Sequence, residues 1–301
     1  MNLKQFHYVL ILAQEASFAK AAGVLGISQP SLSQYIKKIE NQLGVELFNR
    51  TGGNVSLTDA GRIYMDAGRK ILDLERQMCS QFDDLAGHKT GSLVIGTSPY
   101  RSASMMPVIA KRFQEKYPGM HLVVEEMTSQ ELMEAAEHGQ FDFCITMKPV
   151  DTRLFRYVDI ACEEMVLAVP ASMDLFPAVK MPNRKFPAVD AAVMDGQSFV
   201  MITEGQWMQR SLQELALEYN LSLTKAAVVK SLEAQIAMVR AGIGMALLPS
   251  GIERFCAPGE VHFYSFVQDL PKREVVVMWP KERYLSQAAH DFLDEISKID
   301  W

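Results

Sequence analysis

The sequence predicts an all-α winged helix-turn-helix at the N-terminus, then a long linker helix, then an α/β region that fills the rest of the chain. Three observations carry this prediction. Two short helical patterns flank a tight turn near residue 26, an extended apolar stripe follows from residue 59, and strand and helix patterns alternate after residue 92. The 301 residues are enough for two or three domains with hydrophobic cores of their own.

The helix-turn-helix pattern spans residues 18–37. Ser17 is placed to cap a first helix, Gly26 breaks that helix, and Ser28 is placed to cap a second one. Pro30 comes early in the second helix, where its missing N–H leaves no hydrogen bond unmade. Apolar residues recur at helical spacing in both segments: Phe18, Ala21, Ala22 and Leu25, then Leu32, Ile36, Ile39 and Leu43.

The face opposite the second stripe carries short hydrogen-bonding side chains followed by cations. Such groups suit base edges near a helix N-terminus and phosphates beyond it. A helical hairpin with a solvated polar face would show the same periodicity, but the flanking segments count against it. The DNA-contacting residues that we predict are Ser17, Gln29, Pro30, Ser31, Ser33, Gln34, Lys37, Lys38, Arg50 and Thr51.

The flanking segments complete a domain over residues 1–58. A preceding amphipathic helix can close a three-helix core, and residues 45–57 indicate a short hairpin with its tip at Gly52 and Gly53. Thr58 is placed to cap the next helix. The apolar positions of the preceding helix are Leu3, Phe6, Leu10 and Ala13.

These ordered blocks resemble the DNA-binding domain of LysR-type transcriptional regulators. The matching segments are Ser-Gln-Pro-Ser-Leu-Ser at 28–33, Leu-Gly-Val-Glu-Leu-Phe-Asn-Arg at 43–50 and Leu-Thr-Asp-Ala-Gly at 57–61. The sequence departs from the family where Gly53 and Asn54 replace a basic residue, and where Gln34-Tyr35 replaces an arginine followed by glutamine. These departures affect how tightly the domain binds DNA phosphates, not the way it docks on DNA.

The positive charge of the DNA-binding segment is slight. The whole chain has a formal net charge of −6, whereas residues 1–58 contain five Lys and Arg against three Glu. This distribution predicts a modest DNA-binding module joined to a domain with another task. Weak binding by one copy would then be offset by the avidity of a dimer.

Residues 59–90 predict a linker helix that pairs with a second copy, followed by a hinge at Gly87–Gly91. Roughly 27 residues at ~1.5 Å each give a helix of about 40 Å, which is too long and too polar outside for one small domain to shelter. Packing on the chain's own core is the alternative. The family resemblance implies a homodimer and further a homotetramer. The stripe consists of Ala60, Tyr64, Ala67, Ile71, Leu74, Met78, Phe82 and Leu85.

Residues 91–301 alternate strand and helix patterns, which predicts a parallel α/β sheet. This region resembles the effector domain of the same family, whose two lobes face each other across a cleft, as in periplasmic binding proteins. Phe141-Asp-Phe and Ala241–Pro249 are among the matching blocks. The resemblance implies a lobe I of residues 91–162 and 268–301 and a lobe II of residues 163–267.

Hydroxyl groups recur where these predicted strands end. Ligands of open parallel sheets bind at that edge, where helix N-termini attract anions. The alternative for each hydroxyl is a helix cap with no ligand, and the alternative for Arg101 is an ordinary surface arginine. Four methionines near the same strand ends either fill the core or line the cleft: Met127, Met147, Met201 and Met245. The predicted ligand is a small anionic effector, with a carboxylate as its anion. The residues predicted to bind it are Thr97, Ser98, Arg101, Ser102, Thr128, Thr146 and Thr203.

The sequence contains no nucleophile elbow, P-loop or metal-spaced cluster, so we expect no catalysis, cofactor or metal. The four scattered cysteines are expected to be buried reduced thiols. Without an apolar run of ~18 residues or a signal pattern, we expect a cytoplasmic protein without a membrane partner. An activator of this family would also contact RNA polymerase. A repressor that needs no ligand and, more remotely, an α/β enzyme are the alternatives.

Overall fold

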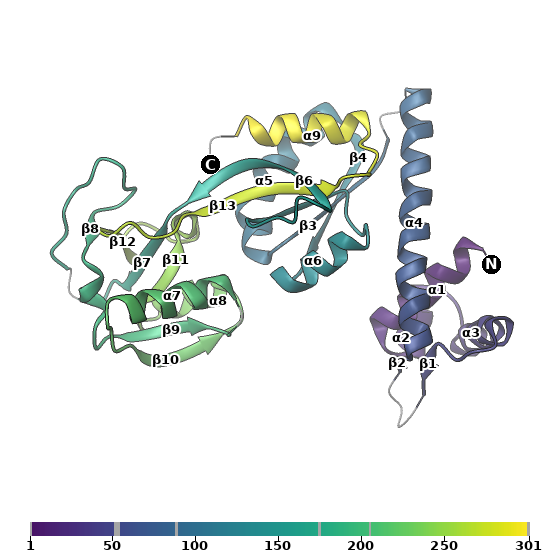
Figure 1. Ribbon diagram of the computed structural model, residues 1–301, viewed down its shortest axis with the longest axis horizontal. Coiled ribbons are helices and arrows are strands. Elements are labelled where there is room, and N and C mark those ends of the chain that lie inside the picture. The colour runs from purple at the N-terminus through teal and green to yellow at the C-terminus, as the bar shows by residue number, and fades with distance from the viewer. Residues whose placement is uncertain (1, 51–54, 88–89, 174–175, 205, 300–301) are drawn as a thin grey trace.

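The computed structural model describes residues 2–50, 55–87, 90–173, 176–204 and 206–299. A helical N-terminal domain leads into one long helix, and two α/β lobes follow on one side of that helix (Figure 1). The N-terminal elements are α1 (Leu3–Glu15), α2 (Phe18–Val24), α3 (Gln29–Leu43), β1 (Phe48–Asn49) and β2 (Ser56–Leu57), and the long helix is α4 (Asp59–Ala86).

The predicted caps set the boundaries of α2 and α3. Ser17 Oγ and Ser28 Oγ each accept a hydrogen bond from the backbone N–H three residues later, at 3.4 and 3.3 Å. Gly44 ends α3 in the left-handed conformation, with φ at +71°. The predicted stripe of α3 is confirmed, because the residues buried in the domain core are Leu32, Ile36 and Ile39, with Leu43 packed beside them.

The face that α1 buries is wider than the sequence predicts. Val9 and Leu12 are fully buried although the predicted stripe omits them, and Leu3 is exposed. The prediction was wrong because α1 packs against α2 and α3 and also against α4. Phe6 of α1 stacks on Tyr64 of α4, with their ring centroids 5.0 Å apart.

Only the first turns of α4 pack on the helical domain. Tyr64 and Met65 are buried there, so the prediction that Tyr64 belongs to a pairing seam was wrong. A Cβ at Gly68 would come within 2.7 Å of the Phe6 ring, which shows how closely α4 approaches α1. Farther along, the residues of the predicted stripe are 38–85 % exposed: Ile71, Leu74, Met78, Phe82 and Leu85.

Lobe I is built on a five-stranded sheet with the order β4-β3-β5-β13-β6. Helices α5 and α9 cover one of its faces and α6 covers the other. The elements are β3 (Thr90–Thr97), α5 (Pro99–Lys116), β4 (Gly119–Glu126), α6 (Ser129–Glu137), β5 (Phe143–Met147), β6 (Phe155–Glu163), β13 (Arg273–Pro280) and α9 (Gln287–Ser297).

The sheet of lobe I is mixed, so the prediction of a parallel sheet was wrong. Strands β3, β4 and β5 are parallel, whereas β13 is antiparallel to both of its neighbours. The reason is that β6 carries the chain out to lobe II and β13 brings it back, so the returning strand must run in the opposite direction. The N-terminus of β13 consequently lies at the edge where the parallel strands end.

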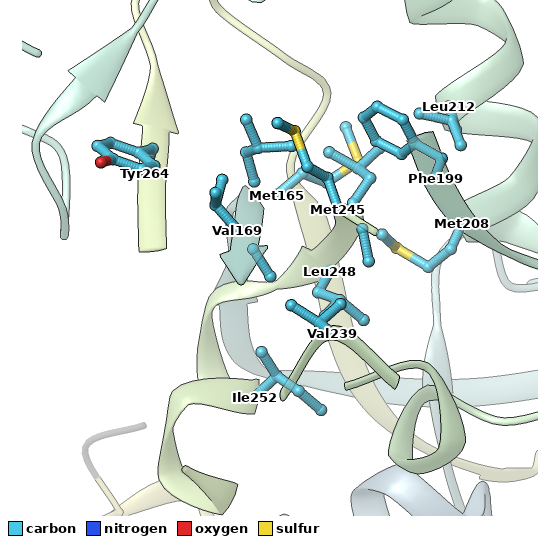
Figure 2. Close-up of a cluster of buried hydrophobic side chains, with 14 of the residues drawn as sticks. Met165, Val169, Phe199, Met208, Leu212, Val239, Met245, Leu248, Ile252 and Tyr264 are labelled. Atoms are coloured by element: carbon cyan, nitrogen blue, oxygen red, sulfur yellow. The ribbon is translucent and has the colours of Figure 1, made fainter. Parts of the chain in front are cut away.

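Lobe II contains a four-stranded sheet of order β11-β7-β12-β8 and the parallel pair β9–β10, which a bridge between Phe199 and Met245 joins to it. Figure 2 shows part of its core, where Met245 is fully buried near Phe199. The elements are β7 (Met165–Pro170), β8 (Ala188–Val189), η1 (Ala191–Met194), β9 (Ser198–Ile202), α7 (Trp207–Glu218), β10 (Thr224–Val229), α8 (Leu232–Arg240), β11 (Ala246–Pro249), η2 (Ser250–Phe255) and β12 (Val261–Phe266).

Candidate functional site

The first candidate site is the exposed face of α3, opposite its buried stripe. Within the part of the chain that the structure describes, no carboxylate pairs with Lys37 or Lys38, so both amines are available to phosphates. Ser31 Oγ lies 2.7 Å from the hydroxyl of Ser28, and Ser33 is half-buried. The predicted DNA-contacting residues that are exposed on this helix are Gln29, Pro30, Ser31, Gln34, Lys37 and Lys38.

Arg50, directly after β1, is bound to α3 rather than left unpaired. Its Nη2 lies 2.6 Å from Glu40 Oε2, and its guanidinium sits 5.3 Å from the centroid of the Phe18 ring. The other carboxylate oxygen of Glu40 accepts the backbone N–H groups of Leu47 and Phe48. This pairing reduces the positive charge that Arg50 offers to DNA. Thr51, also predicted to contact DNA, lies outside the described residues.

The second candidate site is a cavity of about 520 Å³ between the two lobes. Lobe I lines it with the turns that lead into α5 and α6, and lobe II with the segments that lead into α7 and α8. Four of the seven predicted effector residues line this cavity: Ser98, Arg101, Thr128 and Thr203. We call this cavity the effector cleft.

The three predicted hydroxyls that line the cleft already make hydrogen bonds within the protein. Ser98 caps α5 by accepting the N–H of Arg101 at 3.4 Å. The Thr128 hydroxyl caps α6 and lies 2.7 Å from Glu131 Oε2. Thr203 Oγ1 accepts a hydrogen bond from Gln206 Nε2 at 2.9 Å. The alternative of a helix cap is therefore confirmed for Ser98 and Thr128, whereas Thr203 accepts from a side chain in the turn before α7.

Thr97, Ser102 and Thr146 are not among the residues that line the cleft. Thr97 is fully buried and donates to the carbonyl of Ile145 at 3.2 Å, and Thr146 is also buried. Both lie inside strands β3 and β5 rather than beyond them, so their side chains belong to the sheet instead of the cleft edge. The sequence-based placement of these two residues was wrong for that reason.

Two buried arginines line the effector cleft. Arg101 and Arg273 are each 4 % exposed, and both face Glu163, with Arg101 Nη2 at 3.8 Å and Arg273 Nη1 at 3.4 Å from its Oε2. The other oxygen of Glu163 accepts from the hydroxyl of Tyr100 at 3.0 Å. Arg101 Nε and Nη2 and Arg273 Nη1 have no hydrogen-bond partner among the described residues.

One carboxylate thus faces two guanidinium groups, which leaves one positive charge uncompensated in this cluster. Burial, and then the nearby charge of Arg273, lowers the pKa of Arg101 to about 10, so it remains a cation at neutral pH. Burial likewise lowers the pKa of Arg273. Buried N–H donors without partners and a surplus cation together suit an incoming anion.

Arg273 is the residue that sequence reasoning missed. It also lies 5.3 Å from the centroid of Trp207, another residue that lines the cleft. The usable signal was the cationic pair Lys272-Arg273 directly before a predicted strand. In a fully parallel sheet the start of this strand would lie at the edge away from the cleft, and only its antiparallel direction brings Arg273 to the cleft.

The cysteines do not form a site. Cys144 is buried, but Cys79 and Cys162 are exposed, so the expectation of four buried thiols was wrong. All four are free thiols, and burial raises the pKa of Cys144. Among the described residues, no group of three or more His, Cys, Asp and Glu is arranged to hold a metal ion. None of the helices in that part of the chain is long and apolar enough to span a membrane.

Family models cover almost the whole chain. The LysR substrate binding domain matches residues 86–299, and the bacterial regulatory helix-turn-helix of the lysR family matches residues 3–62. The chain belongs to the LysR family. It is a LysR-type DNA-binding transcriptional regulator with an effector-binding domain.

Relatives of this LysR-type regulator extend over its full length. The HTH-type transcriptional regulator YcgK of Bacillus subtilis is 29 % identical over 308 residues, which cover 98 % of this chain and 93 % of YcgK. A "Probable RuBisCO transcriptional regulator" of Thalassiosira pseudonana is 27 % identical over 302 residues, covering 98 % of this chain and 96 % of the relative.

Solved structures of LysR-type regulators share the fold. A full-length OxyR variant from Pseudomonas aeruginosa superposes with a TM-score of 0.72 at 24 % identity, covering 100 % of this chain and 96 % of that one. CbnR gives a TM-score of 0.72 at 21 % identity with full coverage of both chains. Full-length CbnR in complex with its target DNA gives 0.69 at 20 % identity, covering 98 % and 99 %.

Proposed function

We propose that this LysR-type regulator binds a pseudo-palindromic DNA site through α3, as a dimer paired along α4. The exposed face of α3 supplies donors and acceptors near its N-terminus and cations farther along, which is the order that major-groove docking requires. The residues proposed to contact DNA are Ser17, Gln29, Pro30, Ser31, Ser33, Gln34, Lys37 and Lys38, with Arg50 and Thr51 on the flanking backbone.

Two substitutions on α3 test this proposal by separating base reading from phosphate binding. Gln34→Ala should change which bases are selected from a random library. Lys38→Ala should weaken binding to every sequence and lower the slope of log K against log salt by about 1. If neither substitution altered selection or affinity, another element would be reading the DNA.

The exposed stripe of α4 supports the dimer. Leu74, Phe82 and Leu85 are 60–85 % exposed in the single chain, and a second copy of the same helix would cover them. The other side of α4 already meets lobe I, through contacts of Asp73, Arg76 and others. Two such dimers would form the tetramer that the family resemblance implies.

We further propose that a small metabolite with a carboxylate group binds in the effector cleft and changes how the dimer sits on DNA. The single observation that carries this proposal is the pair of buried arginines, for which Glu163 is the one carboxylate partner within the described part of the chain. The cleft then binds its ligand without catalysis, in agreement with relatives that are named as transcriptional regulators.

Calorimetry with a panel of small carboxylates tests this part of the proposal. Arg273→Gln should abolish the binding of any carboxylate that binds the wild-type protein, because it removes the surplus cation. A ligand that binds equally well to the variant would place the site elsewhere. If no carboxylate binds while DNA binding persists, a ligand-independent repressor becomes the better description.

The remaining partners follow from this function. A protein that binds chromosomal DNA acts in the compartment that contains it, which we take to be the cytoplasm. If the regulator activates transcription, its second partner is RNA polymerase bound at the neighbouring promoter.

A further inference from the structure

The effector cleft has an acidic side as well as a basic one. Glu233, at the start of α8 in lobe II, lines the same cavity as Arg101 and Arg273, which belong to lobe I. Oε1 of Glu233 is buried and has no hydrogen-bond partner in the described part of the chain. A buried carboxylate oxygen without a donor is costly. A proton donor on the ligand would relieve that cost.

The charges along the cleft disfavour a ligand with several negative groups. Glu126, Glu131, Glu204 and Glu233 line it, together with Arg101, Lys230 and Arg273. Glu163, which is not among the lining residues, further reduces the positive potential of the two arginines. A second anionic group would therefore lie near a glutamate and be repelled. The cleft accommodates one carboxylate.

The uncharged part of the lining contains apolar side chains beside polar ones. The ring of Trp207 lies against the Arg273 guanidinium, and flexible thioethers extend the surface. A cavity of about 520 Å³ leaves room for a side chain beside the charged ends of a small ligand. The apolar lining residues are Pro99, Met127, Met147, Trp207, Met208 and Leu232, with the ring of Tyr100.

We propose that the effector is a zwitterionic amino acid with an apolar side chain. Its carboxylate binds Arg101 and Arg273, its ammonium donates to Glu233, and its side chain packs on Trp207. The proposal rests on the proposed function, because it assigns a ligand to the same cleft. Such a ligand has no net charge but places one charged end on each lobe, so it holds the two lobes together.

Matched probes separate the two charged ends. Calorimetry on the full chain would use the apolar amino acids, including L-leucine and L-phenylalanine. It would then use their deaminated carboxylates, 4-methylpentanoate and 3-phenylpropanoate, and their decarboxylated amines. The amino acid that binds most tightly should exceed its deaminated carboxylate by about tenfold or more, since a charge-assisted hydrogen bond to a buried group is lost. The amine alone should not compete.

Glu233→Gln isolates the acidic side of the cleft. It should remove the tenfold advantage of the amino acid and leave the affinity of the deaminated carboxylate within about twofold. Glu214→Gln, which changes an exposed glutamate on α7, is the matched control and should alter neither affinity. Equal losses for both ligands in Glu233→Gln would mean that Glu233 acts through the fold, and would overturn its assignment.

The outcomes distinguish this inference from the proposed function beneath it. If the deaminated carboxylates bind as tightly as the amino acids and Arg273→Gln abolishes both, the carboxylate site stands and the amino-acid assignment falls. If no probe binds in a manner that depends on Arg273, both proposals fall together.

Discussion

Replacing Arg283 by methionine should weaken the contact between α4 and lobe I at a measurable cost in stability. Arg283, in the loop between β13 and α9, has a side chain only 1 % exposed. Its Nη1 lies 2.8 Å from Asp73 Oδ1 on α4, and its Nη2 lies 2.6 Å from Asp142 Oδ1 before β5. The Arg283→Met side chain would fill similar space without a charge, leaving two poorly solvated carboxylates.

The magnitude follows from what remains around those carboxylates. Removing one partner of a buried ion pair costs about 3–5 kcal/mol. Asp73 keeps Arg76 at 2.7 Å and Gln77 at 2.8 Å, and Asp142 keeps the backbone N–H of Val94, so the lower end applies. A loss of about 3 kcal/mol lowers the melting temperature of the α/β region that contains Arg283 by roughly 6–12 °C.

Differential scanning calorimetry checks this prediction, and the chain offers a matched control. Arg153 pairs with Asp151 at 2.7 Å, like Arg283 with its partners, but its side chain is 87 % exposed. Arg153→Met should leave the melting temperature unchanged, because solvent screens an exposed pair. Equal melting temperatures for wild type and Arg283→Met, or equal losses in both variants, would refute the reasoning from burial.

The remaining predictions concern the dimer, the wing and the thiols. Leu74→Glu should convert the dimer to a monomer in sedimentation and abolish high-affinity DNA binding. Cys79→Glu places the same charge on α4 outside the exposed stripe and should do neither. A Leu74→Glu protein that still gives a normal footprint would contradict the α4 dimer. Glu40→Gln should destabilise the N-terminal domain, since its buried carboxylate meets Arg50 and two backbone N–H groups; chemical denaturation showing no loss would remove that role. Iodoacetamide should label Cys79 and Cys162 in the native protein and spare Cys144, whose pKa burial raises; early labelling of Cys144 would mean that lobe I opens readily.

The elements of this chain were predictable where one local pattern decides them. The stripe of α3 and its Ser28 cap appear directly in the sequence, as does the alternation of strands and helices in lobe I. The strands β6 and β12 were not predicted, because their residues mix polar and apolar positions while tertiary pairing holds them in the sheets.

The cleft was predictable in location but not in chemistry. Ser98, Thr128 and Thr203 lie at its edge because strand ends meet there, yet their hydroxyls serve as caps or turn acceptors. The strongest anion-binding features depend on Arg273, whose position follows from the direction of β13. That direction is set by the chain's return from lobe II, 100 residues or so after it leaves, and no local pattern encodes it.

The most direct test of the central claim is a DNase footprint of the wild-type protein and of Arg273→Gln, each with and without the carboxylate ligand that binds most tightly in calorimetry. The account predicts the same footprint for both proteins without ligand, and a ligand-induced change in the wild-type protein alone. Coupling of about 1–3 kcal/mol would make that change visible as a shift in spacing or occupancy. A ligand response that survives in Arg273→Gln, or none in the wild-type protein, would contradict the claim that the cleft controls how the regulator sits on DNA.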